Sequence, residues 1–239
     1  MKDGPSQYNK TMLRKHIFSI GEYYHLYNRG TDKRKLFLDI HDYHRFIMLL
    51  YLCNSDQPVD LQKLFREGRS FTELFTIDRG NPIVSIGAWV LMPNHFHILA
   101  KETTENGIAI FMRKVMTGYS MYFNKKHVRN GNLFQGRFKS EHANRDEYLK
   151  YLFSYIHLNP MKLIHGESNW KENGVKDIKK VKGSLLKYEY SSLQSYLEKN
   201  KKYQNIILTK EFPEYFSNLK DFQEELSDWI NFVKDGPSQ

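Results

Sequence analysis

The feature that most limits how this chain can fold is a pair of strand-length runs joined by a very short connection. Ile83 to Leu91 is predominantly apolar, and His95 to Lys101 follows after Pro93-Asn94. Two runs joined this closely favour an antiparallel hairpin, because a parallel pair needs a long crossover. The apolar run is also far shorter than the ~20 residues of a membrane-spanning helix. We therefore expect an antiparallel sheet and no membrane segment.

The other elements follow from the spacing of apolar residues. Tyr23 to Asn28 is rich in β-formers and predicts a strand, and Phe134 to His142 predicts a short one. Apolar residues recur at helical spacing in three stretches, 39–54, 108–123 and 146–159. Asp39 can cap the first of these helices, and Pro160 ends the last. This mixture predicts an α+β fold with helices packed on the sheet.

The chain has 239 residues, enough for one substantial core with an extension. Residues 8–165 are expected to form the main domain, with a variable insertion at about 55–82. Residues 166–233 are expected to form a mainly helical extension that packs on the core, because their aromatic side chains need burial. Lys-Asp-Gly-Pro-Ser-Gln occurs near both ends, so residues 1–7 and 234–239 are interpreted as flexible or as artificial linkers.

Charge and cysteine content narrow the class of protein. The formal net charge of +9 favours a polyanionic partner, although a basic surface that only keeps the protein soluble is equally compatible with it. Cys53 is the single cysteine, which excludes an intrachain disulfide and a zinc site built from thiolates. These features and the polar N-terminus favour a protein of the reducing cytoplasm.

Two histidines on the second run of the hairpin suggest a metal site. Successive side chains on a strand point to opposite faces, so His95 and His97 share one face while Phe96 points to the other. Two imidazoles make an incomplete site, and such a pair is also compatible with ordinary strand histidines that form local hydrogen bonds. The remaining ligand must come from another element.

The helix predicted at 146–159 offers such a ligand together with a nucleophile. At ~100° per residue, Tyr148, Tyr155 and Asn159 fall within one narrow stripe. The neighbouring stripe of apolar residues must face the core, and it consists of Leu149, Leu152, Phe153 and Ile156. An Asn159 oxygen with two imidazoles would suit Mg²⁺ or Mn²⁺. A tyrosine-rich helix packed under the extension explains the same spacing.

Basic residues interleaved with aromatic ones suggest contacts with nucleic acid. Cations can follow a phosphate backbone while exposed rings stack on unpaired bases. The residues expected to contact DNA follow the first strand or flank the last helix, and they are Arg29, Lys33, Arg34, Lys125, Lys126, Arg129, Arg137 and Lys139. Arg137 and Lys139 are the strongest candidates. Single lysines are more often simply solvated, so several of these residues could equally be surface side chains that contact no DNA.

Four motifs in this order resemble the single-tyrosine HUH transposases, most closely the REP-associated tyrosine transposases of bacteria. The motifs are Asn28-Arg29-Gly30, Trp89 to His97, Gly131 to Lys139, and Tyr155 to Pro160. The resemblance covers roughly residues 20–165. It implies a ferredoxin-like sheet, a divalent metal, and single-stranded DNA with a hairpin as substrate.

Carried over to this sequence, the resemblance gives each site residue a role. His95 and His97 become the HUH metal ligands, Asn159 the helical ligand, and Tyr155 the nucleophile that forms a 5′-phosphotyrosine bond to DNA. Tyr151 is the rival nucleophile, one turn earlier on the helix. Some relatives have glutamine at the position of Asn159, so the resemblance does not fix how strongly this chain binds the metal. The protein is expected to act as a monomer or homodimer. Among the proteins it resembles, compact relatives are dimers that share sites between subunits, and REP-associated ones are expected to act as monomers.

Other functions stay open at this stage. One is a domesticated, non-catalytic protein that binds hairpin DNA, although such a binder needs neither the paired histidines nor Tyr155. Another is a rolling-circle replication initiator or relaxase, which shares the chemistry but serves plasmids. A third is a metal phosphoesterase that acts on small nucleotides without a covalent intermediate.

Overall fold

The computed structural model describes residues 18–164, 177–196, 201–213 and 224. The strands are β1 (Tyr23–Arg29), β2 (Val84–Met92), β3 (His95–Glu102) and β4 (Lys139–His142). The α-helices are α1 (Ile40–Leu52), α2 (Leu61–Arg66), α3 (Gly107–Lys126), α4 (Asp146–Leu158), α6 (Ile178–Lys187) and α7 (Leu193–Tyr196). Short 3₁₀ turns lie at Thr31–Lys33, Glu73–Thr76, Asn159–Leu163, Lys201–Ile206 and Thr209–Glu211.

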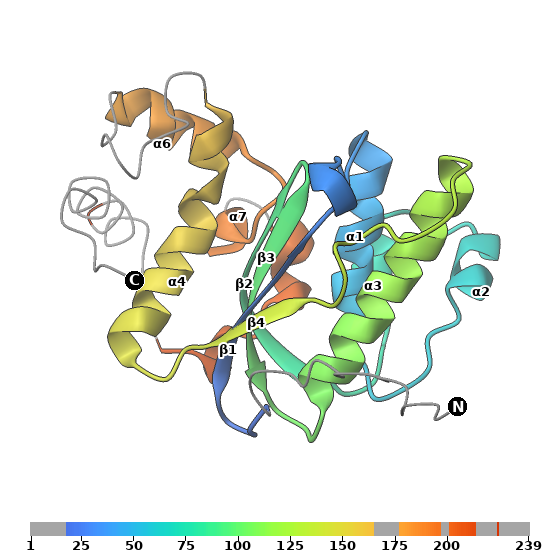
Figure 1. Cartoon of the computed structure of the whole chain (residues 1–239). Helices are drawn as coiled ribbons and strands as arrows, with labels where there is room; N and C mark the ends of the chain where they lie inside the picture. The colour runs from blue at the N-terminus through green and yellow to red at the C-terminus, as the bar shows by residue number, and fades with distance from the viewer. Residues whose placement is uncertain (1–17, 165–176, 197–200, 214–223, 225–239) are drawn as a thin grey trace, which may run out of the picture.

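Within the described residues the strands form one four-stranded antiparallel sheet in the order β2-β3-β1-β4 (Figure 1). The chain order β1, α1, β2, β3, α3, β4 with this strand order is the ferredoxin-like arrangement. The predicted hairpin is confirmed, since β2 and β3 pair from Val84 with Glu102 to Met92 with His95. The α+β class and the antiparallel sheet are therefore both as expected.

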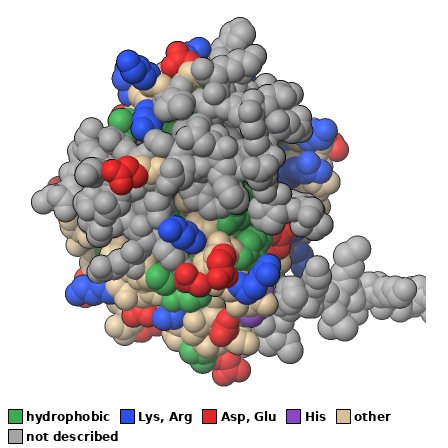
Figure 2. Space-filling model, turned by 90° about the vertical axis from the view of Figure 1, so that its left-hand side faces the viewer, with side chains coloured by type: hydrophobic (Ala, Val, Ile, Leu, Met, Phe, Trp, Pro, Cys, Tyr) green, Lys and Arg blue, Asp and Glu red, His purple; other side chains and the backbone are tan. Residues whose placement is uncertain are grey.

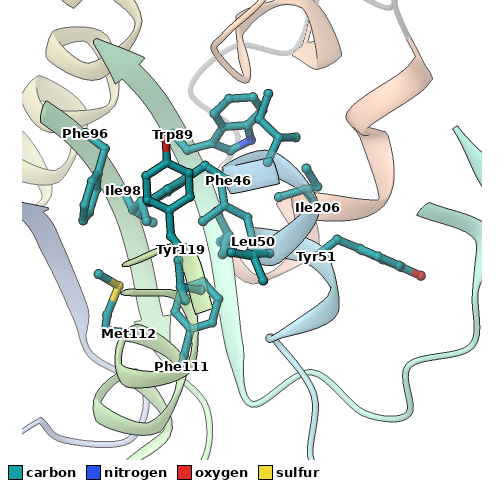
Figure 3. Packing of buried hydrophobic residues seen from close by; sticks show 14 of the residues in the cluster. Phe46, Leu50, Tyr51, Trp89, Phe96, Ile98, Phe111, Met112, Tyr119 and Ile206 are labelled. Atoms are coloured by element: carbon teal, nitrogen blue, oxygen red, sulfur yellow. The ribbon is translucent and has the colours of Figure 1, made fainter. Parts of the chain in front are cut away.

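Helices α1 and α3 cover one face of the sheet (Figure 1). Asp39 starts α1 as predicted, because its carboxylate accepts the backbone N–H groups of His41 and Asp42. The core on this side is a large cluster of buried residues from β2, β3, α1 and α3 (Figure 3), including Phe46, Leu50, Trp89, Phe96, Ile98, Phe111 and Tyr119. Each has at most 1% of its surface exposed, so close packing holds this face of the sheet against α1 and α3.

Helix α4 packs on the opposite face, on its own cluster of buried residues. The predicted apolar stripe of Leu149, Leu152, Phe153 and Ile156 meets Ala88, Val90, Met92 and Leu99 of β2 and β3. The sheet thus separates two apolar layers, and the alternation along β3 sends Phe96 and Ile98 into one and Leu99 into the other.

The described part of the extension packs on the core. Its chain follows the edge strand β2, where the Leu91 N–H donates to the Tyr190 carbonyl at 2.9 Å and the Ser192 N–H to the Trp89 carbonyl at 2.9 Å. Tyr203 and Ile206 are buried in the cluster beside α1. The end of the expected extension, residues 214–233, lies outside the described residues, apart from Glu224.

Two predicted boundaries are wrong. The strand expected from Phe134 to His142 exists only as β4, because Gly136 has a φ of +73° and the preceding residues form a loop. Phe134 instead makes a single bridge to Gly30. Helix α4 ends at Leu158, and the chain continues through Pro160 as a 3₁₀ turn rather than stopping there. No helix in the described part of the chain has the length and apolarity to cross a membrane.

Candidate metal and tyrosine site

Strand β3 places His95 and His97 on the face of the sheet that α4 covers. Their neighbour Phe96 is fully buried on the other face, so the strand cannot rotate to turn the histidines away. The two imidazole centroids lie 5.1 Å apart with an interplanar angle of 87°. The prediction that both histidines share one face is thus confirmed by the geometry of the strand.

Asn159 reaches the same point from the end of α4, as its spacing after Tyr155 predicts. Its side chain is completely buried, and neither of its polar atoms makes a hydrogen bond of ordinary geometry within the described part of the chain. It lies beside both His95 and Tyr155, where it partly opposes the effect of burial, which lowers the pKa of His95 and raises that of Tyr155. Buried polar groups are normally satisfied by a hydrogen bond or a bound ion, so the Asn159 amide is a candidate ligand.

Tyr155 lies against the histidines. Its ring centroid is 5.5 Å from that of His97 and 6.1 Å from that of His25, edge to face in both cases. Burial raises the pKa of the Tyr155 phenol and the Glu141 charge adds to the effect, whereas Asn159 opposes it. Tyr151 stacks on Tyr155 at 5.8 Å, one turn earlier on α4.

The donor set fits a divalent ion. His95 Nδ1 lies 2.7 Å from the side-chain oxygen of Asn94, which leaves Nε2 with the lone pair that a metal needs. Burial, aided by the Lys162 and Arg29 charges, lowers the pKa of His95 to about 4, so the ring is neutral at pH 7. No group of three or more His, Cys, Asp or Glu side chains is arranged for a metal within the described residues. The candidate ligands are therefore two imidazoles and the Asn159 amide oxygen, a set that suits Mg²⁺ or Mn²⁺.

Sequence reasoning missed three further residues at this site. His25 of β1 contacts His97, with 2.8 Å between His25 Nε2 and His97 Nδ1. Glu141 of β4 lies 3.8 Å from His25 Nδ1. Lys162 lies with its ammonium 5.7 Å from the centroid of the Tyr155 ring, and burial lowers the pKa of this lysine. Strand alternation places residues 23, 25 and 27 on one face, but it does not tell which residues of a neighbouring strand His25 meets.

The Glu141 carboxylate is held by several donors. The hydroxyls of Tyr27 and Tyr148 donate to it at 2.8 and 2.9 Å. The His25 imidazole is the main influence on its pKa, which falls to about 2 with the help of these hydroxyls. Burial and this carboxylate raise the pKa of Tyr27 to about 12. Glu141 is thus an ionised acceptor at neutral pH.

The residues expected to contact DNA are spread over several strands, helices and loops. Lys33, Arg34 and Lys125 are exposed, as are Arg137 and Lys139 beside β4. Three others are engaged within the protein: the Arg29 guanidinium with Gln135, the Lys126 ammonium with Asp39 and Asp42, and the Arg129 guanidinium with Asn124. On the face that carries α4, the visible Lys and Arg side chains lie beside Asp and Glu (Figure 2). Their contact with DNA stays a prediction.

Comparisons with known proteins find a transposase family that matches part of the chain. Residues 77–159 match the model of the family described as "Transposase IS200 like". This segment contains the hairpin, α3, β4 and α4, and with them His95, His97, Tyr155 and Asn159. One similar solved structure is described as "Structure of the REP associates tyrosine transposase bound to a REP hairpin"; it has a TM-score of 0.46 and 17% identity, over 80% of this chain and 84% of that chain. No curated protein matches the chain.

Proposed function

We propose that this chain is a transposase of the single-tyrosine type, which cuts and rejoins single-stranded DNA next to hairpins. The observation that carries the proposal is the convergence of Tyr155 from α4 on the imidazoles of β3, with 5.5 Å between the ring centroids of Tyr155 and His97. The family match over residues 77–159 supports it, because that segment includes His95, His97, Tyr155 and Asn159.

His95, His97 and Asn159 would hold the divalent ion, Mg²⁺ or Mn²⁺. When bound, the ion supplies a Lewis acid that polarises the scissile phosphate and neutralises developing charge. The protein's part is to keep the ligands ready. Burial keeps His95 neutral, and the buried Asn159 amide is held beside His95 and Tyr155.

Tyr155 would act as the nucleophile. Its phenolic oxygen attacks phosphorus in line, the bond between phosphorus and the 3′ oxygen breaks, and a 5′-phosphotyrosine and a 3′-hydroxyl result. The phenol loses its proton as the new bond forms, and the departing 3′ oxygen gains one. One phosphodiester replaces another, so a second 3′-hydroxyl can reverse the step and join new strands without ATP.

Lys162 would assist the attack. Burial raises the pKa of Tyr155, which makes the phenolate harder to form unless a nearby charge favours it. The Lys162 ammonium lies over the Tyr155 ring, where it can stabilise negative charge on the phenol oxygen or on the phosphate. It is a cation that the sequence motifs did not assign.

The DNA would approach along the loops around β4. Arg137 and Lys139 are exposed there, and Arg29 is fastened to the same loop through Gln135. A net charge of +9 favours a nucleic acid over a neutral substrate. The hairpin is the substrate that the resemblance implies, and its sequence must be found by experiment.

A labelled-oligonucleotide assay tests the proposal. The protein is incubated with Mg²⁺ or Mn²⁺ and single-stranded hairpins labelled at the 5′ or the 3′ end, and adducts that survive denaturant are sought on a gel. A 5′-phosphotyrosine predicts that the 3′-labelled fragment shifts with the protein. Tyr155→Phe should remove the adduct, whereas the matched variant Tyr151→Phe should keep it.

The other outcomes identify the alternatives. Hairpin binding without any adduct in the wild type would indicate a non-catalytic binder. Cleavage without an adduct would indicate a phosphoesterase. An adduct that persists in Tyr155→Phe and disappears in Tyr151→Phe would refute the assignment of the nucleophile.

A further inference from the structure

Behind His97 lies a second imidazole that the chemistry proposed above does not use. His25 Nε2 and His97 Nδ1 are 2.8 Å apart, and the two rings lie nearly parallel at 20°. Both side chains are buried, with 5% and 7% of their surfaces exposed. At this distance one nitrogen must carry the hydrogen and the other must accept it.

Glu141 lies on the far side of His25. The two residues are register partners across β1 and β4, and His25 Nδ1 is 3.8 Å from Glu141 Oε2. The Tyr27 and Tyr148 hydroxyls both donate to the carboxylate, which fixes its position. Three groups therefore stand in a line from the sheet edge toward the metal ligands: carboxylate, imidazole, imidazole.

The carboxylate decides which tautomer is favoured. If His25 carries its hydrogen on Nδ1, that hydrogen faces the negative oxygen, and His25 Nε2 is left to accept from His97 Nδ1. His97 then has its lone pair on Nε2, the atom available to a metal. The opposite arrangement would set a His25 lone pair against the carboxylate and place a hydrogen on His97 Nε2, where it would block coordination.

A different group favours the same tautomer in His95, with the hydrogen on Nδ1. Its Nδ1 lies 2.7 Å from the Asn94 side-chain oxygen, an acceptor, so its Nε2 also keeps the lone pair. Both histidines of β3 are thus backed at Nδ1 by a neighbour that accepts a hydrogen. Two independent neighbours that enforce the same tautomer are hard to explain by packing alone.

We propose that Glu141, acting through His25, is a positioning residue that holds His97 in the tautomer able to bind a divalent metal. The metal-binding part rests on the function proposed above. The tautomer itself is a property of the metal-free protein, so it can be tested separately.

The first test reads the tautomer directly. Protein labelled with ¹⁵N-histidine is examined by long-range ¹H–¹⁵N NMR without metal, with His97 assigned through His97→Gln. Wild type should show the hydrogen of His97 on Nδ1. Glu141→Gln, whose amide can donate to His25 Nδ1, should move it to Nε2. A His97 hydrogen on Nε2 in wild type, or an unchanged tautomer in Glu141→Gln, would overturn the proposal.

The second test measures Mn²⁺ affinity by electron paramagnetic resonance without DNA. Glu141→Gln should weaken binding roughly 10- to 100-fold, the usual effect of losing such a supporting group. Glu22→Gln is the matched control, because Glu22 pairs with His142 at 2.7 Å on the same two-strand edge. It should bind Mn²⁺ like the wild type. Thermal unfolding of each variant verifies that it is folded.

The metal site of the proposed function and the positioning role of Glu141 would fail with different results. If wild type binds no Mn²⁺ while the NMR result is as expected, the metal site of the proposed function fails and the tautomer assignment stands. If wild type binds Mn²⁺ through His97 but Glu141→Gln binds equally well, the positioning role fails and the metal site stands. Equal weakening in Glu22→Gln would also count against the specific role of Glu141.

Discussion

At the scale of single residues, the candidate site depends on side chains from five elements that lie close together. β3 supplies His95 and His97, α4 supplies Tyr155, and the turn that follows it supplies Asn159 and Lys162. β1 and β4 add His25 and Glu141 behind them. Each of these side chains is held by backbone in regular structure or by a tight turn, which limits how far it can move.

The side chains within one element were predictable, and those that depend on register were not. Strand alternation places His95 and His97 together, and helical spacing places Asn159 one turn after Tyr155. His25 reaches His97 only because β1 pairs with β3 so that Tyr27 is opposite His97 and His25 is its diagonal neighbour. Short-range patterns contain no information about that register, so His25 and Glu141 could not be found from them.

Lys162 allows a prediction at this scale. Lys162→Met keeps most of the side-chain volume but removes the charge over the Tyr155 ring. The rate of adduct formation should fall by roughly 10²-fold, as when one stabilising donor is removed from a reacting centre, with hairpin binding nearly unchanged. Single-turnover kinetics on the labelled hairpin measure this. Lys63→Met, on exposed α2, should react at the wild-type rate; an equal loss in both variants would contradict the assignment.

At the scale of elements, the position of α4 depends on a polar contact with the extension. His157 of α4 is buried and has its Nε2 2.8 Å from Ser192 Oγ. The same hydroxyl accepts the Trp89 N–H of β2 at 2.9 Å. Burial lowers the pKa of His157 to about 3, so the ring is neutral. The extension thus joins α4, which carries Tyr155, to the edge of the sheet.

Ser192→Ala should weaken this junction. The substitution leaves two buried polar groups without their partner, which costs roughly 2–4 kcal/mol of unfolding free energy. Hydrogen exchange of α4 amides should accelerate more than that of α1, which packs on the other face. Ser191→Ala is the control, because the neighbouring hydroxyl accepts a long bond of 3.4 Å. Equal protection of α4 in both variants would show that Ser192 does not hold the helix.

The errors at element scale have a physical cause. The motif from Gly131 to Lys139 resembles a strand because of its aromatic residues, but the Asn28 amide donates to the Gly136 carbonyl at 3.1 Å and the Gln135 N–H to the Arg29 carbonyl at 2.9 Å. These contacts fold the segment over the end of β1. A loop held by long-range bonds has no periodic signature, so propensity alone assigns it to the wrong class.

At the scale of the whole molecule, one chain contains the complete candidate site. Tyr155 and His97 belong to the same polypeptide and lie with ring centroids 5.5 Å apart, and the stripe of α4 is buried on the sheet of its own chain. The sequence alone left open whether sites are shared between subunits. The packing favours a site that each chain completes for itself.

A mixing experiment tests this expectation. Tyr155→Phe and His97→Ala are each expected to be inactive, and a mixture of the two should stay inactive if each chain uses its own tyrosine. Adduct formation on the labelled hairpin is the measurement, over a range of protein concentrations. Recovery of adduct in the mixture would show that α4 is exchanged between chains. Each variant mixed with wild type serves as the control for inhibition.

Acid sensitivity of the whole fold follows from two carboxyl groups. Burial alone would raise the pKa of Asp42, but the Lys126 ammonium, the Leu38 N–H and the Tyr122 hydroxyl lower it overall. The pKa of Glu141 falls from 4.5 to about 2, mainly because of His25. A folded-state pKa below the unfolded one means that the stabilisation is present above the unfolded pKa and is lost as pH falls through the folded pKa.

We therefore expect the Tm at constant ionic strength to fall steadily from about pH 5 to about pH 2. Asp42→Asn should lower stability at neutral pH by roughly 1–3 kcal/mol, the range for bonds to a charged group, and should flatten the acid slope. Thermal unfolding followed by circular dichroism measures both. Glu105→Gln, an exposed position, should leave the slope unchanged. A slope that is the same in Asp42→Asn would exclude Asp42 as a source of the sensitivity.

The alternation along β3 has an evolutionary consequence. The insertion or deletion of one residue inside this strand would move every later side chain to the opposite face of the sheet. Phe and Ile side chains would then replace the imidazoles on the face that α4 covers, and the imidazoles would enter the apolar core beside α1 and α3. The proposed site and the fold would be lost in one event. Under the proposed function, descendants that no longer cleave DNA yet still fold should therefore be recognisable by single-residue changes at positions 95, 97 or 155, with the length of this strand conserved.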